Sequence, residues 1–266
     1  MKKSIKHSIG ADLENKVAII TGGGSGIGKS IAQLFAEKKG RVYILEIDKK
    51  RGLAVQNEIL NNNNFGQFYH CDVSDGTSIK AAVNNVLDAE KRIDILVNNA
   101  GISHIGTIEQ TTSSDLDRVY NANVKSVYLT TKHVIGAMVK NGGGTILNLA
   151  SILAKVGVDE RFAYSMSKGA VLAMTLSIAK DYIGQNIRCN CICPARVHTP
   201  FVDDYLKKNY AGKEKEVFDK LSTFQPIGRM GQPDEIAQLA LFLCSDASSF
   251  ITAAAYDIDG GVVNLR

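Results

Sequence analysis

Residues 17–28 read VAIITGGGSGIG, and this stretch decides the fold of the chain. Residues 16–20 are rich in β-branched side chains, which predicts a strand, and an amphipathic pattern over 27–38 predicts a helix. The glycines between them let the backbone turn tightly and bring the positive N-terminal end of the helix close to a pyrophosphate. A glycine cluster is also compatible with a simple strand-to-helix turn, so the rest of the chain must support a dinucleotide site.

Strand and helix patterns alternate from this turn to the end of the chain. Further strands are expected at 42–45, 65–70, 93–97, 145–149, 187–193 and 254–258, and helices at 49–60, 77–89, 113–139, 163–183 and 233–243. Strands separated by helices of this length form βαβ units in a parallel sheet, and right-handed crossovers place helices on both of its faces. The sequence therefore predicts a doubly wound α/β fold, in a single domain over residues 13–266.

Bulk composition narrows the classes of function. The 266 residues carry a net charge of +4 with mixed signs throughout, and 45% are hydrophobic, as in soluble globular proteins. This charge is too small and too dispersed to favour nucleic acid as a partner. No stretch is apolar enough for a membrane span, and residues 1–12 lack the apolar centre of a signal peptide. We therefore expect a disordered leader over 1–12, a cytoplasmic location and no membrane partner.

Three of the five cysteines, Cys189, Cys191 and Cys193, alternate along one predicted strand. Alternation places their side chains on one face of that strand. A metal or redox cluster is one interpretation, but no second CxxC pair and no histidine pair accompanies them. Because free cysteine is among the residue types most often buried, we favour a core position and expect no metal site.

The end of the second predicted strand carries the candidate for cofactor choice. Glu46 lies 24 residues after Gly22, near the offset at which a carboxylate binds the 2′-hydroxyl of the adenosine ribose. The next residue is Ile47 and not arginine, so no adjacent cation would compensate a 2′-phosphate. Glu46 therefore favours NAD over NADP; the alternative is a solvated strand end without a ligand.

Two further strand ends carry candidate cofactor contacts. Asp72 and Val73 follow the third predicted strand, and the run Asn98-Asn99-Ala100-Gly101 ends the fourth. Open α/β sheets bind ligands at the carboxyl ends of their strands. We expect Asp72 to accept a hydrogen bond from the adenine amino group, and the small residues Ala100 and Gly101 to let the backbone approach the cofactor.

The pattern that bears most directly on catalysis is Tyr164-Ser165-Met166-Ser167-Lys168. Tyr164 and Lys168 are four residues apart and share one face of the predicted helix. A neighbouring ammonium lowers the pKa of a tyrosine from its ordinary value near 10, which makes the phenol usable as an acid–base. Ser151 lies 13 residues before Tyr164, where its hydroxyl can reach a substrate oxygen. Alone, a Tyr-x-x-x-Lys pair is common on solvated helix surfaces.

Together these motifs resemble the short-chain dehydrogenase/reductase family. The residues that carry the resemblance are Thr21, Gly22, Gly26, Gly28, Asn98, Asn99, Ala100, Gly101, Asn123, Ser151, Tyr164 and Lys168, and it extends from Lys16 to about Gly261. It implies a single seven-stranded Rossmann domain, an NAD(P)-dependent oxidoreductase that acts on CH–OH groups, and a homotetramer.

The resemblance also implies roles for individual residues. Tyr164 is the acid–base, and Lys168 binds the nicotinamide ribose and lowers the pKa of Tyr164. Ser151 orients the substrate oxygen, and Asn123 holds a water in the proton relay. Cofactor contacts are expected at Thr21, Gly22, Ser25, Gly26, Ile27, Gly28, Glu46, Asp72, Val73, Asn99, Ala100, Gly101, Tyr164, Lys168, Pro194, Val197 and Thr199.

The chain departs from the family pattern at two glycines. After the sixth strand the usual Pro-Gly is Pro194-Ala195, and late in the chain the usual Thr-Gly is Thr252-Ala253. If the second glycine normally takes a positive φ, the alanine is strained there. Neither change touches the residues expected in catalysis.

Residues around the expected pocket suggest the class of substrate. His104, Arg161, Arg196 and His198 are the candidates for substrate contact, beside Ser151 and Tyr164 themselves. Residues 200–222 form a polar insert that the family uses as a substrate lid. Cations and imidazoles suit a hydroxyl-rich or carboxylate-bearing substrate, and the stretch 194–201 resembles bacterial sugar and sugar-acid dehydrogenases such as L-fucose dehydrogenases. For each of these residues, a solvated charge on a loop is the alternative.

Two other functions remain as alternatives. The first is an NADPH-dependent 3-oxoacyl-carrier-protein reductase, against which Glu46 followed by Ile47 argues. The second is a dinucleotide-binding scaffold or redox sensor without catalysis, against which the intact set of Asn123, Ser151, Tyr164 and Lys168 argues.

Overall fold

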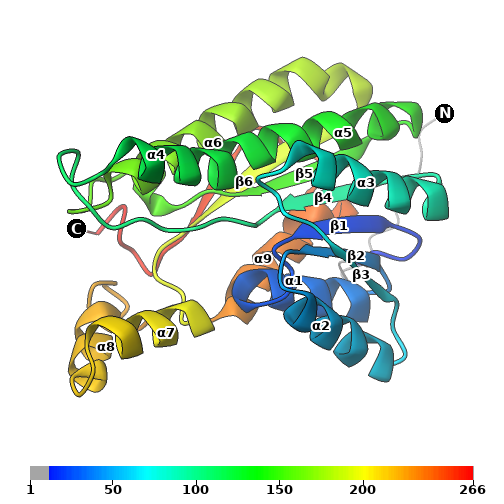
Figure 1. Cartoon of the computed structure of the whole chain (residues 1–266). Coiled ribbons are helices and arrows are strands. Elements are labelled where there is room, and N and C mark those ends of the chain that lie inside the picture. The colour runs from blue at the N-terminus through cyan, green and yellow to red at the C-terminus, as the bar shows by residue number, and fades with distance from the viewer. Residues whose placement is uncertain (1–11, 266) are drawn as a thin grey trace.

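The computed structural model describes residues 12–265 and builds them into one α/β domain around a seven-stranded parallel sheet (Figure 1). The leader predicted over 1–12 lies outside the described residues, apart from Asp12. The strands are β1 (Val17–Thr21), β2 (Arg41–Glu46), β3 (Gly66–His70), β4 (Ile95–Asn98), β5 (Gly144–Leu149), β6 (Ile187–Pro194) and β7 (Ala255–Ile258). The prediction of a doubly wound Rossmann sheet is confirmed, and each strand lies within two residues of its expected position.

The strand order is β3-β2-β1-β4-β5-β6-β7. The chain moves outward from β1 to β3 and then returns to the other side of β1, so the order reverses between β1 and β4. In sheets of this kind, ligands bind beyond the carboxyl ends of the strands at such a switch point. The fold therefore places the glycine-rich turn after β1 beside the run that follows β4.

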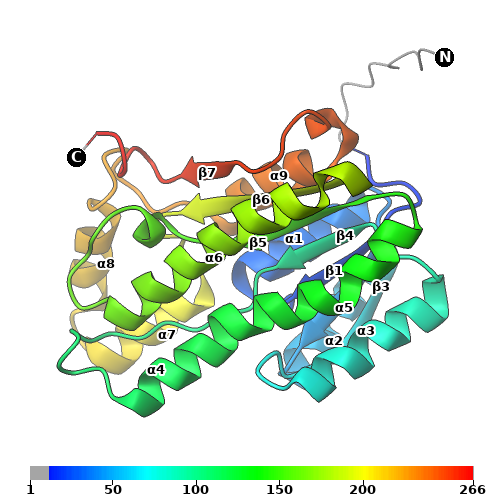
Figure 2. The ribbon, with the colours of Figure 1, turned by 90° about the horizontal axis from the view of Figure 1, so that it is seen from above.

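Helices cover both faces of the sheet, as Figures 1 and 2 show. One face carries α1 (Gly26–Glu37), α2 (Lys49–Asn61) and α9 (Pro233–Cys244), and the other carries α3 (Gly76–Glu90), α4 (Ser113–Tyr120), α5 (Ser126–Lys140) and α6 (Phe162–Tyr182). Each face has its own apolar core, because β1 is buried along its whole length and sends alternate side chains into both. Side-chain caps start several helices, with Asp48 at α2 and Asp75 at α3.

The helix predicted over 113–139 is not regular. A turn of π-helix over Asn121–Lys125 separates α4 from α5, so one extra residue is inserted between them. Turns of this kind are concentrated at functional sites. The inserted turn contains Asn123, one of the residues predicted for catalysis.

The insert predicted at 200–222 folds as two helices. They are α7 (Pro200–Asn209) and α8 (Glu214–Ser222), joined through Gly212, whose φ is +81°. Pro200 begins α7, where its missing N–H costs nothing. The pair projects beyond the end of the sheet in Figure 1, next to the carboxyl end of β6.

All five cysteines lie in the described chain, are free and are buried. Cys189 packs in the core between the sheet and α3, α5 and α6, while Cys191 and Cys193 belong to a smaller cluster beside α6. Within residues 12–265, no group of three His, Cys, Asp or Glu side chains is arranged to hold a metal.

Helices that could cross a membrane are absent from the described chain, since none is both long and apolar enough.

Ala253 occupies the backbone conformation that its sequence position suggested. Its φ is +57°, a left-handed value that alanine adopts at a cost. The residue lies just before β7, and its N–H donates to the Cys189 carbonyl at 2.8 Å. Ala195 does not share this feature, because its φ is not positive.

Candidate active site

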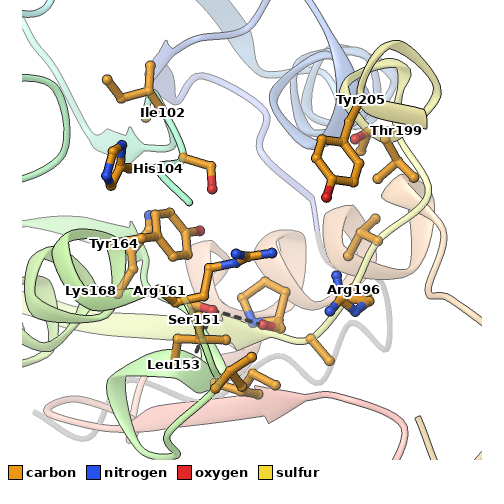
Figure 3. A pocket seen from close by; sticks show the side chains of 18 of the residues that line it. Ile102, His104, Ser151, Leu153, Arg161, Tyr164, Lys168, Arg196, Thr199 and Tyr205 are labelled. Carbon is orange, nitrogen blue, oxygen red and sulfur yellow. Dashed lines mark hydrogen bonds between the residues drawn. The ribbon is translucent and has the colours of Figure 1, made fainter. Parts of the chain in front are cut away.

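A cavity of about 710 Å³ opens at the carboxyl ends of the central strands (Figure 3), and residues of α7 and α8 form part of its lining. Residues from the glycine loop, the β4 end, the β5 end, α6 and the β6 end all line it. Of the predicted site residues, those in its wall are Ile27, Asn99, Gly101, His104, Ser151, Arg161, Tyr164, Lys168, Pro194, Arg196, Val197 and Thr199. The topology therefore brings most of the predicted catalytic and substrate residues into one pocket.

The glycine loop is tied to the end of β4 by side chains on both. The hydroxyl of Thr21 accepts the backbone N–H groups of Asn99 and Ala100 at 3.0 and 3.1 Å. In return, the Asn99 amide donates to the carbonyls of Thr21 and Gly22 at 3.0 and 3.1 Å. Thr21 and Asn99 thus hold the loop in shape through their side chains.

Two glycines of the loop have no room for a side chain. A Cβ on Gly28 would lie 2.2 Å from the Gly22 carbonyl oxygen, and one on Gly22 would lie 2.9 Å from the Ala100 Cα. Gly22 and Gly26 also have φ values of +64° and +52°. Ser25 caps α1 without a side-chain hydrogen bond, so its hydroxyl does not satisfy the first N–H groups of this helix. The loop fits a pyrophosphate held by backbone donors and the helix dipole.

Glu46 lies directly over this loop. Its Oε2 accepts the Gly24 N–H at 3.0 Å and its Oε1 accepts the Asp48 N–H at 3.1 Å. The neighbouring Ile47 is 57% exposed and offers no charge. A fixed carboxylate at the end of β2 fits a ribose diol, which can donate hydrogen bonds to it, and opposes a phosphate.

Of the other predicted cofactor residues, Asp72 and Val73 follow the end of β3, and Thr199 follows β6. The Asp72 Oδ1 accepts from the backbone N–H and the hydroxyl of Ser74, which fixes the carboxylate at the β3 end. Val73 packs against the apolar core on the α3 side of the sheet. Thr199 touches the loop from the other side, since a Cβ on Gly26 would lie 3.2 Å from its Cγ2.

Ser151 and Tyr164 meet at the floor of the pocket. The Ser151 Oγ accepts the Leu153 N–H at 3.2 Å, which fixes the hydroxyl at the end of β5. Burial raises the pKa of Tyr164 to about 12, against which a hydrogen bond from Ser151 and the charge of Arg161 both act. The phenol is therefore protonated through the neutral range.

Lys168 departs from its expected effect on Tyr164. Its ammonium donates to the Leu149 carbonyl at 2.7 Å and lies 5.6 Å from the centre of the Tyr164 ring. Burial lowers the pKa of Lys168 to about 8. The expected lowering of the Tyr164 pKa by Lys168 is not found, because desolvation dominates both groups and the ammonium is turned toward the backbone.

Asn123 is buried beneath the pocket and not in its wall. Its amide clamps Ile102, accepting the backbone N–H at 2.8 Å and donating to the carbonyl at 2.9 Å. The same nitrogen donates to the Ser167 hydroxyl at 3.0 Å. Asn123 thus joins the loop after β4 to α6, next to Lys168. Its role in holding a relay water stays a prediction.

A second amide network positions the strands behind the site. The Asn98 Nδ2 donates to the Asn148 Oδ1 at 2.9 Å, and the Thr130 hydroxyl donates to the Asn98 Oδ1 at 2.6 Å. Asn148 in turn donates to Thr175 on α6 at 2.9 Å. Because buried amides need partners, this chain fixes β4, β5, α5 and α6 relative to one another.

One predicted substrate residue does not reach the cavity. His198 faces the two-helix insert, where its Nε2 lies 2.9 Å from the Asp203 Oδ1 and its ring packs edge-on against Phe218. Strand β6 ends at Pro194, so the alternation of a strand does not set the direction of the His198 side chain. His104 does line the cavity and contacts Thr111 at 3.3 Å.

The insert contributes pocket residues that the sequence analysis missed. Val202 and Tyr205 of α7 and Phe224 after α8 line the cavity. Val202 and Tyr205 are three residues apart, so they share a helix face. This spacing of apolar residues could have indicated a helix face turned toward the pocket, but the many charged residues of the segment made the pattern hard to recognise.

Comparisons with known proteins agree with this geometry. Residues 22–263 match the family described as Enoyl-(Acyl carrier protein) reductase. The chain is 36% identical to the 3-oxoacyl-acyl-carrier-protein reductase FabG of Chlamydia pneumoniae, covering 94% of this chain and 98% of that protein. It is 35% identical to the 2-keto-3-deoxy-L-fuconate dehydrogenase of Xanthomonas campestris pv. campestris, covering 99% of this chain and 85% of that protein.

A solved structure resembles the whole domain. The L-sorbose reductase from Gluconobacter frateurii, complexed with NADPH and L-sorbose, superposes with a TM-score of 0.91 at 28% identity, covering 96% of this chain and 98% of that one. The named substrates of these similar proteins differ, so the substrate of this chain must be argued from its own pocket.

Proposed function

Because the chain belongs to the short-chain dehydrogenase/reductase family and is an oxidoreductase of that family, we propose that it uses NAD to interconvert a secondary alcohol and its ketone in a sugar, a polyol, or a sugar or hydroxy acid. The observation that carries the proposal is the meeting of Ser151, Tyr164 and Lys168 in one pocket beside the glycine loop. The identities of its relatives support the reaction class, and the pocket supports a polar substrate.

The choice of NAD rests on Glu46. Its carboxylate is fixed by two backbone N–H groups at the end of β2, where the adenosine ribose of a bound dinucleotide would lie. A 2′-phosphate there would face a fixed negative charge with Ile47 as the next residue. Thr21, Asn99 and the glycines would hold the pyrophosphate side of the cofactor, and Tyr164 and Lys168 the nicotinamide side.

The chemistry divides between the cofactor and the protein. A nicotinamide, when bound, would supply the hydride chemistry at the carbinol carbon. The Ser151 hydroxyl hydrogen-bonds the substrate oxygen, and Tyr164 takes its proton in oxidation or gives it back in reduction. Lys168, whose ammonium lies 5.6 Å from the centre of the Tyr164 ring, would hold the nicotinamide ribose beside the phenol.

A second candidate is reduction of a 3-oxoacyl thioester on a carrier protein. The 36% identity to the Chlamydia pneumoniae enzyme of that name favours it. Glu46 speaks against it in this chain, since we expect that activity to use NADPH.

We further propose a homotetramer and a cytoplasmic location. Large apolar side chains are exposed on the helices that cover one face, at Tyr120, Tyr128, Val139, Phe162, Met166 and Leu176. Exposed apolar groups in such numbers favour burial in an interface. Free cysteines suit a reducing compartment. Light scattering at micromolar concentration tests the assembly, and a monomer would contradict it.

A substrate screen tests the function. Purified protein is mixed with NAD or NADP and a panel of sugars, polyols, aldonates and hydroxy acids, and reduced cofactor is followed by absorbance. Turnover with NAD on at least one member is expected. Turnover restricted to NADPH and 3-oxoacyl thioesters would replace this proposal by the second candidate.

A further inference from the structure

We propose that the substrate carries a carboxylate, which Arg161 and Arg196 bind from two walls of the pocket while the reacting carbon lies at Ser151 and Tyr164. This inference rests on the proposed function and narrows its substrate class to hydroxy acids and their oxo acids. Neutral sugars and polyols are thereby excluded as the preferred substrates.

Arg161 is placed by the start of α6. It caps that helix three residues before Tyr164, and Figure 3 shows its guanidinium extending into the pocket between Tyr164 and Arg196. One of its N–H groups donates to the Glu160 carbonyl at 2.9 Å. Arginine has five such donors in a rigid fork, so a carboxylate can still be bound by two parallel hydrogen bonds.

Arg161 differs from most arginines of the described chain in lacking an acidic partner. Arg41, Arg92 and Arg229 pair with Glu90, Asp94 and Glu235, and Arg51 and Arg118 pair with Asp48 and Asp115. Arg188 is bonded to the backbone and Thr145. Within residues 12–265, no carboxylate comes within 4.0 Å of Arg161. Its guanidinium is thus available in the one place where a substrate must lie.

Arg196 approaches the same space from the end of β6. Its guanidinium lies 5.0 Å from the centre of the Phe224 ring, which holds the side chain against the insert. Figure 3 shows Arg161 and Arg196 turned toward the same space, with Tyr205 above them. Burial raises the pKa of Tyr205, and the charges of Arg161 and Arg196 oppose that rise, so both lie near that ring. Three groups from three elements therefore surround one end of the pocket.

The charge balance of the pocket favours an anion. Besides Lys168 and the Asp115-paired Arg118, its wall contains the cations Arg161, Arg196 and Lys208, against the single acid Asp204. A cleft of one predominant sign raises the local concentration of oppositely charged ligands. Apolar side chains such as Leu153 and Val158 complete the wall, where the carbon chain of the substrate would lie.

The experiment compares matched substrates. Each pair has one carboxylate member and one neutral member, namely 3-hydroxybutanoate with 3-hydroxybutanamide and gluconate with glucitol. The ratio of their kcat/KM values with NAD is measured for the wild type, Arg161→Gln and Arg196→Gln. We expect a preference for the acids in the wild type and a fall of that preference by about 10- to 100-fold in each variant, as for a lost hydrogen bond to a charged group.

The ratio separates binding from chemistry. Both members of a pair use the same acid–base, so a change at Tyr164 caused by the loss of the Arg161 charge cancels. Arg118→Gln is the matched control, because Arg118 also lines the cavity but pairs with Asp115, and its ratio should stay within about twofold of the wild type. Equal use of neutral and acidic members by the wild type would overturn the inference and leave the proposed function intact.

A binding measurement covers the case in which no pair is turned over. Calorimetry with pentanoate and pentanamide, which cannot react, is run on the protein in the presence of NADH. Tighter binding of pentanoate that is lost in Arg161→Gln supports the carboxylate site even if the proposed reaction fails. Equal affinity for both compounds, or no binding of pentanoate, contradicts it.

Discussion

The glycine loop and the end of the pocket near Arg161 and Arg196, called here the substrate end, lie at the same edge of the sheet. The first presents backbone groups and the second presents side chains. The shape of the loop leaves no room for a side chain, since a Cβ on Gly28 would lie 2.2 Å from the Gly22 oxygen. The substrate end is made by side chains such as Arg161, Arg196 and Tyr205, of which one stands on the two-helix insert. The comparison suggests that cofactor binding is fixed by fold geometry, whereas substrate choice rests on replaceable groups.

The largest effect should come from Tyr164→Phe, which separates the two regions most sharply. The variant loses the acid–base but keeps the loop and Glu46, so turnover should fall by about 10²-fold or more while NAD affinity is retained. Steady-state kinetics and a titration of NADH fluorescence measure the two properties. Near-normal turnover would remove Tyr164 from the mechanism.

The second test is the pH dependence of the rate of alcohol oxidation, which should change by about tenfold per pH unit below pH 8. Oxidation requires the Tyr164 phenolate and the Lys168 ammonium together. With the pKa of Tyr164 near 12 and that of Lys168 near 8, this form increases with pH up to about 8. Above that pH, the gain of phenolate and the loss of ammonium cancel, so the rate should level off near 8.

Carbonyl reduction should show the complementary profile. It requires the protonated phenol and the ammonium, so the rate should be constant below about pH 8 and fall above it. Initial rates of oxidation and of reduction between pH 6 and 10 measure the two pH profiles. An oxidation rate that keeps rising tenfold per unit up to pH 10 would mean that the charge of Lys168 is not needed.

The third test alters a side chain at the edge of the loop. The wild type should prefer NAD to NADP by at least about tenfold in kcat/KM, or roughly 1.4 kcal/mol. Replacing Glu46 by alanine and Ile47 by arginine should narrow or reverse that preference, without affecting Tyr164 chemistry. Equal use of both cofactors by the wild type would contradict the role given to Glu46.

The smallest effect concerns the backbone alone. Ala253 has a φ of +57°, a value that glycines take in the turn after β1. Ala253→Gly should therefore relieve strain of about 1–2 kcal/mol, and the greater chain entropy of glycine in the unfolded state should offset part of that gain in stability. A rise in Tm of roughly 2–4 °C is expected. Ala195→Gly is the control, because Ala195 does not have a positive φ. It should not be stabilised.

The sequence sufficed for the sheet and for the glycine-rich turn that follows β1, because strand burial and glycine geometry are local properties. The helix over 113–139 illustrates the limit. Nothing in the composition of Asn121–Lys125 marks a π-turn, and nothing there shows that Asn123 within it contacts both Ile102 and Ser167 across the fold. Long-range contacts of this kind cannot be read from periodicity.

The substrate end was less predictable for the same reason. Ser151, Tyr164 and Lys168 follow from spacing and family resemblance, and Arg161 and Arg196 do lie in the pocket wall. The direction of the His198 side chain depends on where the chain turns after β6. The effect of Lys168 on the Tyr164 pKa depends on the Leu149 carbonyl, which binds the ammonium and is distant in the sequence. Desolvation by the assembled fold then decided the sign of the Tyr164 shift.

The π-turn at Asn121–Lys125 also governs how this region tolerates changes of length. One residue advances an α-helix by about 100° around its axis, so the added residue turns the faces of α4 and α5 relative to each other. That rotation lets one continuous rod pack against α6 at its start and against α3 further on. Deleting a single residue there would leave both helices intact but rotate their packing faces away from their present contacts. The loop at Gly212 between α7 and α8 can change length without rotating a helix about its axis.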